Sequence, residues 1–282
     1  MKKLILSPLF LLMLFSITVA QQYDFKKGDS YTVTTSVDQI ITQMMMGQEM
    51  EITNQVETVE KYEISSVENG IFTIKVTSLS NKTTAGSPQG TVTMSSDGTS
   101  TTDLTMKAIT GVEFSFKMDR SGRVLEVIGT EAAQAHVKNT LEGTPLAQSI
   151  SQISSAYTEE NLTSNLDTKF NIYPESPASE WTKEKNLTLN NMPVSLTSDY
   201  SLSGNEITTD GTLIISGKGA FNGMQLDMDM EGTQKGSYII NNESGAILSS
   251  ESETEMNGSV STQGITIPMY ITSTTKTTMA KN

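Results

Sequence analysis

A two-residue alternation of apolar and polar side chains runs through most of this chain. In 49–64, Met50, Ile52 and Val56 take one parity, and Glu51 and Glu57 take the other. Successive side chains of a β-strand point to opposite faces, so this pattern places one face of a sheet on a core and the other in water. Antiparallel sheets show this division. The same alternation recurs in 112–118, 224–231 and 265–272.

Turn-forming pairs separate the alternating runs. Asn69-Gly70, Asp97-Gly98 and Asp210-Gly211 each supply a residue that tolerates positive φ, which is typical of hairpins. Several runs exceed the usual five or six residues of a strand, and glycines within them allow the sheet to bend. The sequence therefore predicts a mainly β fold, a long-stranded antiparallel curved sheet or half-barrel. The embedded glycines are Gly217, Gly219, Gly232 and Gly236.

One segment departs from the two-residue period. Thr130 can cap a helix that runs from Glu131 to Glu142. Thr144-Pro145 can start a second helix and Thr158 can cap a third. Each has a single apolar stripe, so we expect the helices to lie against the sheet. The pattern predicts a short helical insertion near 130–170.

The first twenty residues have the features of a secretory signal. A basic start at Lys2 and Lys3 precedes an apolar run, and small residues before Gln21 suit a signal peptidase. The chain has no cysteine, so no thiol is present for lipidation or for disulfides. No later run approaches the ~20 apolar residues of a membrane span. We expect an exported protein, periplasmic or extracellular, that is not a lipoprotein and has no membrane span after signal cleavage.

The domain organisation has two open descriptions. Residues 1–20 form the signal peptide and 21–282 form a single β-rich domain. Within that domain, 21–129 and 178–282 could be two related β-units joined by the helical segment 130–177. The alternative is that hairpins of similar sequence arose independently. The segments with faint similarity are 28–32 with 178–182, and 119–125 with 242–248.

The charge balance is strongly acidic. Cleavage after residue 20 removes Lys2 and Lys3, leaving 17 basic residues against 32 acidic ones and a net charge of −15. Nucleic acids and anionic membrane surfaces attract Lys and Arg, so the balance argues against both as partners. We predict a soluble exported protein with no nucleic-acid partner.

Four short motifs lie along the chain in a fixed order. They are Lys27-Gly28-Asp29-Ser30-Tyr31, Ser121-Gly122-Arg123-Val124, the junction from Tyr173-Pro174 through Pro177 to Trp181, and Ser244-Gly245. In this order the chain resembles an uncharacterised family of secreted or periplasmic proteins from Bacteroidetes-type bacteria. The resemblance covers most of the mature chain and implies an envelope or secreted protein, with no catalytic residues to carry over. In architecture the chain also resembles periplasmic lipoprotein-carrier and lipocalin-like half-barrels, a likeness that does not fix function.

Candidate catalytic groups are few. The one histidine, His136, lies in the first expected helix, and no Gly-x-Ser-x-Gly elbow is present. Ser273 and Lys276 have Ser-x-x-Lys spacing but lie in a Thr-rich segment expected to be a strand. Paired carboxylates are abundant, so a hydrolase that uses them stays a third hypothesis. With no phosphate-binding, dinucleotide or zinc motif either, we predict a protein that is not an enzyme and has no cofactor.

An acidic ladder is the candidate ion site. If the turn at 241–245 pairs its flanking strands symmetrically, Glu231 faces Glu255 and Asp229 faces Asn257. Like charges across a sheet repel, and a Ca²⁺ ion could relieve that repulsion. The alternative is a solvated outer face, which the lack of any fixed loop geometry favours. The candidate calcium ligands are Asp227, Asp229, Glu231, Glu253 and Glu255.

Methionine carries the leading hypothesis. Fourteen of the sixteen methionines lie after residue 20, many on apolar faces, and the same symmetric register places Met230 opposite Met256. Unbranched thioether side chains suit a surface that accepts apolar ligands, although they also serve as core filler where aromatic residues are scarce. The candidate ligand-binding residues are Met50, Met118, Met224, Met228, Met230, Met256 and Met269.

These observations favour a non-catalytic binding module. It would hold an apolar ligand or a cell-envelope partner on the Met-rich face of its sheet, with the helices between Glu131 and Phe170 as a plug or lid. The main alternative is a structural scaffold of the cell envelope with a filled core and no ligand.

Overall fold

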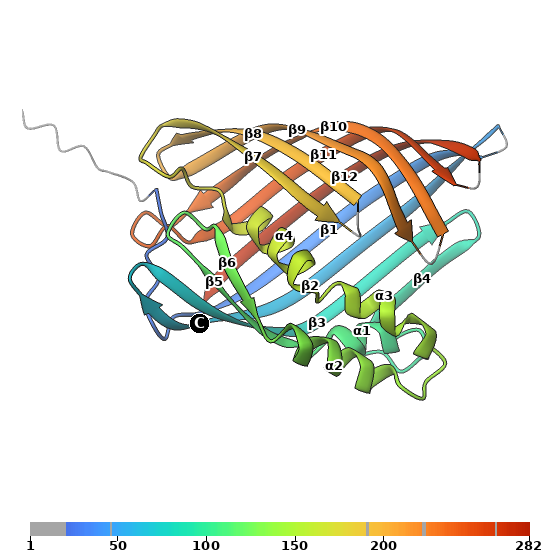
Figure 1. Ribbon diagram of the computed structural model, residues 1–282, viewed down its shortest axis with the longest axis horizontal. Helices are drawn as coiled ribbons and strands as arrows, with labels where there is room; N and C mark the ends of the chain where they lie inside the picture. Colours follow the sequence, from blue (N-terminus) through green and yellow to red (C-terminus); the bar gives the residue numbers. More distant parts are fainter. Residues whose placement is uncertain (1–20, 46, 190–191, 222–223, 263) are drawn as a thin grey trace, which may run out of the picture.

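The computed structural model describes residues 21–45, 47–189, 192–221, 224–262 and 264–282. Twelve strands form one antiparallel sheet that curves strongly around the helices (Figure 1). The prediction of a mainly β, long-stranded, curved antiparallel sheet is confirmed. The hydrogen-bonded order is β6-β5-β3-β2-β1-β12-β11-β10-β9-β8-β7, with β4 paired to β3. Because β6 and β7 end this order, the sheet is an open half-barrel.

The strands come equally from the two halves of the chain. The pairing of β1 with β12 joins the halves into one sheet. The division into two related units stays a prediction. The first half supplies β1 (Ser30–Met45), β2 (Gln48–Glu68), β3 (Ile71–Ser87), β4 (Gly90–Ser95), β5 (Glu113–Met118) and β6 (Val124–Ile128). The second half supplies β7 (Glu180–Leu189), β8 (Met192–Ser203), β9 (Glu206–Phe221), β10 (Met224–Ile240), β11 (Ile247–Thr262) and β12 (Ile265–Lys281).

The helical insertion lies where the sequence predicts it, with two local corrections. Gly129 at φ 89° is the N-cap of the first of these helices, so Thr130 is its first residue and not its cap. The second helix begins at Ile150, after a 3₁₀ turn, and not at Thr144-Pro145. Thr158 caps the third helix as predicted, because its side chain accepts a hydrogen bond from the Asn161 backbone N–H. The helices are α1 (Leu104–Ile109), α2 (Thr130–Leu141), η1 (Ala147–Ser149), α3 (Ile150–Ser155) and α4 (Glu159–Phe170).

Helix α1 was not predicted from the sequence. It has six residues, too few for a recognisable apolar period, and it buries Met106 and Ala108. It packs against β3 and β4.

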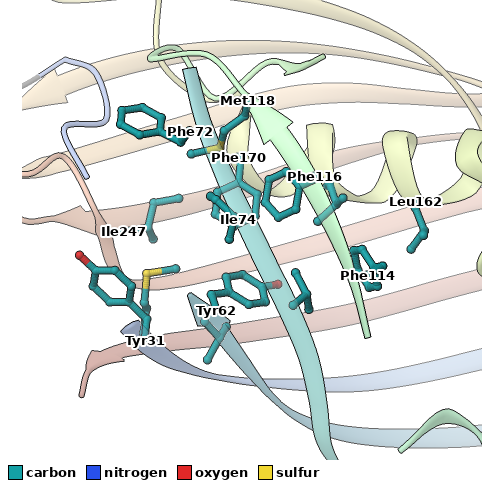
Figure 2. Close-up of a cluster of buried hydrophobic side chains, with 14 of the residues drawn as sticks. Tyr31, Tyr62, Phe72, Ile74, Phe114, Phe116, Met118, Leu162, Phe170 and Ile247 are labelled. Atoms are coloured by element: carbon teal, nitrogen blue, oxygen red, sulfur yellow. The ribbon is translucent and has the colours of Figure 1, made fainter. Parts of the chain in front are cut away.

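Helix α4 crosses the open side of the half-barrel and packs against both end strands, β6 and β7 (Figure 1). Its last residue, Phe170, lies in the main hydrophobic core, where its ring centroid is 5.8 Å from that of Tyr62 and 5.5 Å from that of Phe116. Figure 2 shows these side chains converging from β2, β5 and α4. The core therefore fills the end of the half-barrel at which β1 starts. We call this the core end.

The N-terminal segment seals the core end. The Tyr23 N–H donates to the Arg120 carbonyl and the Asp24 N–H donates to the Ser244 carbonyl, both at 2.8 Å. The segment therefore lies between two turns, Ser121-Gly122 and Ser244-Gly245. The buried hydroxyl of Tyr23 donates to the Phe170 carbonyl at 3.0 Å, which ties the segment to the end of α4.

The opposite end of the sheet consists of the long hairpins. There β1 ends at Met45, β3 ends at Ser87, and β2 and β4 each begin three residues later. We call this the tip end. It extends well beyond α4 (Figure 1).

Candidate functional site: the inner face of the tip end

The inner face of the sheet is the face that carries Tyr62, which packs against α4. On β2 the same parity continues from Tyr62 to Ile52 and Met50. On β12 it continues from the buried Met279 to Ile271 and Met269. The predicted alternation is therefore observed, with the apolar parity facing inward.

Cross-strand partners on this inner face form rows across the half-barrel. Three consecutive rows toward the tip end are made largely of aliphatic and Met side chains, and we call them apolar rows one, two and three. Row one contains Leu196, Leu213, Gly232, Met256, Ile271, Ile41 and Ile52. Row two contains Leu187, Val194, Ile215, Met230, Gly258, Met269, Gln43 and Met50. Row three contains Gly217, Met228, Val260 and Ile267.

These rows are less covered than the core, although Val194, Leu196, Met230 and Met256 within them are buried. Ile52, Ile41 and Ile271 in row one are half-buried, as are Met269 in row two and Met228 in row three. At the core end, by contrast, Val33 and Ile207 have no exposed surface. The tip end thus presents a curved, partly covered apolar face, which is the property that an apolar ligand requires.

A row of polar side chains separates the apolar rows from the core end. We call it the polar row. Its Gln234 amide donates to the Thr254 hydroxyl at 3.3 Å. Small and amide side chains here keep the inner face hydrophilic just before the apolar rows begin. The polar row contains Ser198, Gly211, Gln234, Thr254, Ser273, Gln39 and Asn54.

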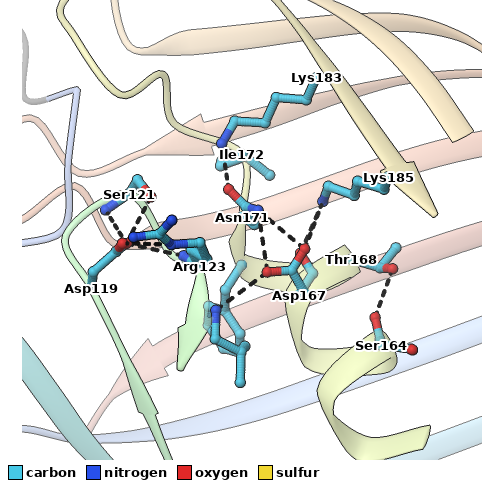
Figure 3. A network of polar contacts seen from close by, with 12 residues as sticks. Asp119, Ser121, Arg123, Ser164, Asp167, Thr168, Asn171, Ile172, Lys183 and Lys185 are labelled. Carbon is cyan, nitrogen blue, oxygen red and sulfur yellow. Dashed lines mark hydrogen bonds and ion pairs between the residues drawn. The ribbon is translucent and has the colours of Figure 1, made fainter. Parts of the chain in front are cut away.

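On β7, the last strand of the sheet, two lysines continue these rows. Lys183 pairs with Ser198 of the polar row, and Lys185 pairs with Leu196 of apolar row one. Figure 3 shows both ammonium groups directed at the C-terminal end of α4. The Lys185 Nζ donates to the Asp167 carbonyl at 2.9 Å and lies 4.0 Å from the Asp167 carboxylate. The Lys183 Nζ donates to the Asn171 side-chain oxygen.

Burial dominates the electrostatics of this pair of lysines. The Lys185 side chain is only 6% exposed. Desolvation of its ammonium lowers the pKa of Lys185 to about 8, against an opposing effect of Asp167. Burial also lowers the pKa of Lys183. The Asp167 carboxylate is itself held by the Val124 N–H at 3.2 Å, so it links α4 to β6 as well as to β7.

The predicted methionine candidates divide into two groups. Met50, Met228, Met230, Met256 and Met269 lie together on the inner face of the tip end. Met118 does not, since it is fully buried on β5 at the core end. The side chain of Met224 lies outside the described residues.

Two of these methionines do not face one another as predicted. Met230 lies opposite Gly258 and Met256 lies opposite Gly232, because the register of β10 with β11 is two residues away from the symmetric one. A bulge between Ile239 and Ile240 contributes to this shift.

The same shift corrects the acidic ladder. Glu231 faces Asn257, Asp229 faces Ser259, and Glu255 faces Thr233, so the predicted Glu231–Glu255 pair does not form. Asp227, Asp229, Glu231, Glu253 and Glu255 do share the outer face. Within the described part of the chain, no three acidic or histidine side chains come together in a group that could hold a metal ion.

Among the candidate catalytic residues, Ser273 and Lys276 lie apart, and Lys276 and His136 make other contacts. Ser273 and Lys276 lie on β12 three residues apart, so their side chains point to opposite faces. Lys276 pairs with Glu251 on the outer face at 2.9 Å. The His136 Nε2 lies 3.0 Å from the Thr110 carbonyl, a contact that joins α2 to the end of α1.

Three surface hollows differ in their position relative to the apolar rows. The largest, about 1000 Å³, lies at the rim of the core end beside Arg120, Arg123 and Glu175. A second, about 600 Å³, follows β7 to β9 beside Trp181. The third, about 390 Å³, includes Leu213, Gly232 and Met256 of row one together with outer-face residues.

The lysines and the polar row were missed by sequence reasoning. The two-residue period of β7 does place Lys183 and Lys185 on the same face as Trp181 and Leu187. That inward placement was the signal by which the two lysines could have been identified. Their partners on α4 are distant in sequence and carry no local pattern.

Among the described helices, none has the length and apolar character needed to cross a membrane.

The fold is similar to part of a lipovitellin of known structure. A lipovitellin structure concerned with lipid–protein interactions matches 91% of this chain with a TM-score of 0.52 at 12% identity. The chain spans about a quarter of the lipovitellin chain (25%), and at this identity the likeness shows the fold alone. An outer membrane channel from Pseudomonas putida F1 matches 92% of this chain and 97% of its own, with a TM-score of 0.22 at 7% identity. OccK7 from Pseudomonas aeruginosa matches 91% of this chain and 100% of its own, with a TM-score of 0.27 at 7% identity. TM-scores this low do not show a shared fold.

Sequence comparison identifies the family. No curated protein shows significant similarity to this sequence. A family model matches residues 68–247, which is more than half of the 282-residue chain. The expectation of an uncharacterised family is thereby confirmed, whereas its bacterial group and its secretion stay predictions. The chain belongs to a family of unknown function, DUF6263.

Proposed function

We propose that this protein is an exported, non-catalytic binding module that holds an apolar ligand on the inner face of the tip end. The observation that carries the proposal is the set of three apolar rows, which share one concave face and are only partly covered. Aliphatic and Met side chains make up most of these rows. Such side chains adapt to ligands of variable shape, because Met is unbranched and has three rotatable bonds.

Two further features support a small apolar ligand. Helix α4 and the core fill one end of the half-barrel, so a ligand on the apolar rows would be covered from the core side by existing structure (Figure 1). The lipovitellin structure with a similar fold is concerned with lipid–protein interactions. Export is part of the proposal because residues 1–20, which lie outside the described part of the chain, have the features of a secretory signal.

A neutral apolar dye tests this function. We would titrate the mature protein with N-phenyl-1-naphthylamine and follow its fluorescence. We expect saturable binding that Met228→Asp weakens by about tenfold or more, because a carboxylate on row three makes the face unfavourable for apolar groups. Met44→Asp is the matched control, since Met44 lies on the outer face of β1 and is 44% exposed.

The outcomes separate the proposal from its main alternative. Loss of dye binding in Met228→Asp, with Met44→Asp unchanged and both variants folded by circular dichroism, supports the ligand-binding face. If the parent binds no dye, or if folded Met228→Asp binds as well as the parent, the proposal fails. The scaffold hypothesis, in which contacts with envelope proteins carry the function, is then preferred.

A further inference from the structure

We propose that the tip end docks on a lipid bilayer whose head groups carry no net charge, with its hairpin ends in the bilayer surface. This docking surface lies outside the three apolar rows, so the proposal goes beyond the proposed function and assigns the protein a partner. The hairpins that form the tip end all point away from the core end (Figure 1). They join β1 to β2, β3 to β4, β7 to β8, β9 to β10, and β11 to β12.

Every hairpin of the tip end lies in a stretch of sequence without charged residues. Charged residues make up 18% of the chain, so uncharged stretches at all of these hairpins are a distinct feature. Charged side chains are the most costly groups to bring into a bilayer, whereas uncharged polar groups are tolerated in the head-group region. The composition of the tip end therefore suits contact with lipid. The stretches are 39–48, 83–96, 186–198, 219–226 and 256–275.

The hairpins of the core end show that this lack of charge is not a general property of the sheet. They belong to the same strands and are also rich in Ser, Asn and Gly, yet each carries at least one charged residue. A surface that only water covers is expected to carry charges, and the core end does. The charged residues of these hairpins include Glu68 between β2 and β3, Asp119, Arg120 and Arg123 between β5 and β6, Glu206 at the start of β9, and Glu243 between β10 and β11.

Large apolar side chains are exposed on the uncharged hairpins. Ile265, the first residue of β12, is 63% exposed, and Val92 on β4 is 52% exposed. Ile265 shares the inner face with Ile267 of row three. Val92 lies opposite Ala85, which in turn lies opposite Asn54 of the polar row, so it also faces inward. Both side chains would leave water on contact with lipid, which favours docking.

The first charges beyond these stretches lie on the outer face. Glu49 lies opposite Met44 there, and Lys218 lies directly opposite Asp227, a pair of opposite sign. The inner side of the hairpin ends is therefore the side that suits contact with lipid. In this orientation the apolar rows open onto the bilayer, so an apolar ligand could pass between the two without crossing water.

Other occupants of the tip end fit less well. A stable protein–protein interface buries about 800 Å² on each partner and includes hydrogen-bonded and charged pairs at its rim. The hairpin ends form a curved rim without charges to pair, which disfavours a second copy of the chain (Figure 1). Anionic lipids are disfavoured because the chain has 32 acidic residues against 19 basic ones. A bilayer without net charge meets neither objection.

Co-flotation with phosphatidylcholine vesicles tests the docking. We expect the mature protein to float with the vesicles, no less in high NaCl and no more when half of the lipid is phosphatidylglycerol. Ile265→Asp combined with Val92→Asp should weaken vesicle binding by about tenfold or more. Leu125→Asp combined with Leu248→Asp is the matched control, because it makes the same charge change at two exposed apolar residues of the core end.

A single cysteine locates the contact, because the chain has none of its own. Ile265→Cys and Leu248→Cys would each carry one nitrobenzoxadiazole label, whose fluorescence rises on transfer from water to lipid. We expect phosphatidylcholine vesicles to raise the fluorescence of the label at position 265 and not that at position 248. This measurement decides the question if the aspartate variant at the tip end is unfolded by circular dichroism.

The outcomes separate the docking from the proposed function. If the parent does not float, if the folded tip-end variant floats as well as the parent, or if both labels respond alike, the docking inference is wrong and dye binding still decides the apolar-ligand function. Preference for phosphatidylglycerol or release by NaCl also overturns it. A lipid-free dimer that Ile265→Asp with Val92→Asp dissociates would show that a second copy covers the tip end. Docking without dye binding would defeat only the proposed function.

Discussion

Met256 on β11 lies directly opposite Gly232 on β10, and its side chain occupies the space that a residue larger than glycine would need. A Cβ atom on Gly232 would come within 2.8 Å of the Met256 Cγ and 2.1 Å of the Glu255 carbonyl oxygen. Met230 and Gly258 repeat this arrangement one row further toward the tips. The two methionines are buried although the face around them is only partly covered. Glycine and methionine together therefore build the floor of the apolar rows.

This relationship predicts that Gly232→Ala and Gly258→Ala each lower the free energy of unfolding by about 1–3 kcal/mol. In both cases the added methyl group meets the backbone of the neighbouring strand, which can yield only by moving the sheet. Urea unfolding followed by circular dichroism measures the loss. Gly86→Ala on β3 is the matched control, because the atom nearest its new methyl is the rotatable Thr53 hydroxyl. Equal losses in all three variants would contradict the argument.

The sequence predicts which face of the sheet each side chain occupies. It does not predict the register between neighbouring strands. Alternation alone places Met228 and Met230 on the inner face, and any shift by an even number of residues leaves that placement unchanged. The register of β10 with β11 depends on the connection between Ile240 and Ile247, which is one residue longer than a symmetric turn, and on a bulge that adds one more. Neither feature has a sequence signal as strong as the alternation.

The polar part of the candidate site was beyond sequence reasoning for a different reason. Asp167 lies near the end of α4 and Lys185 lies in the middle of β7, and no local period relates a helix residue to a strand residue. Only the packing of α4 across the end strands brings them together (Figure 3). Helical periodicity could predict that α4 has an apolar stripe, but not which end strand its polar residues would meet.

The tyrosines at the core end should contribute unequally to stability. Among the described residues, the Gly245 carbonyl accepts a hydrogen bond from the Tyr173 hydroxyl alone, at 2.6 Å. The Phe170 carbonyl accepts from Tyr23 and also from the Ile172 N–H at 2.8 Å. We expect Tyr173→Phe to cost about 1–3 kcal/mol, because it leaves a carbonyl unsatisfied, and Tyr23→Phe about 1 kcal/mol.

Urea unfolding of the two variants tests this order. Tyr270→Phe is the control, since Tyr270 is exposed on the outer face of β12 and its loss of a hydroxyl should leave stability unchanged. A larger loss in Tyr23→Phe than in Tyr173→Phe would show that the second donor to Phe170 does not compensate.

Calcium should not stabilise the protein. The observed register places Glu231 opposite Asn257 and Glu255 opposite Thr233, so the outer-face carboxylates are diagonal neighbours without a common focus. We expect the melting temperature to be the same in CaCl₂ as in MgCl₂ at equal ionic strength, because both salts then only screen the acidic surface. A saturable rise specific to CaCl₂ that Glu231→Gln abolishes would restore the calcium site.

Lys185 should give the stability of the protein a distinct pH dependence. Burial lowers its pKa to about 8 in the folded chain from 10.5 in the unfolded chain, against the opposing effect of Asp167 and with a further lowering by Lys183. Between these two values the unfolded chain binds a proton that the native chain has released. The free energy of unfolding therefore gains from this group as the pH rises from about 8 to about 10.5, by on the order of 2 kcal/mol.

The measurement is the difference in unfolding free energy between the parent and Lys185→Met at pH 7.5 and pH 10. Buried tyrosines such as Tyr62 have a raised pKa and lower the stability of both proteins at high pH, so their effect cancels in the difference. We expect the parent to gain relative to Lys185→Met as the pH rises. A constant difference would mean that the ammonium is not desolvated in the native state, and Lys185 would then be an ordinary exposed partner of Asp167.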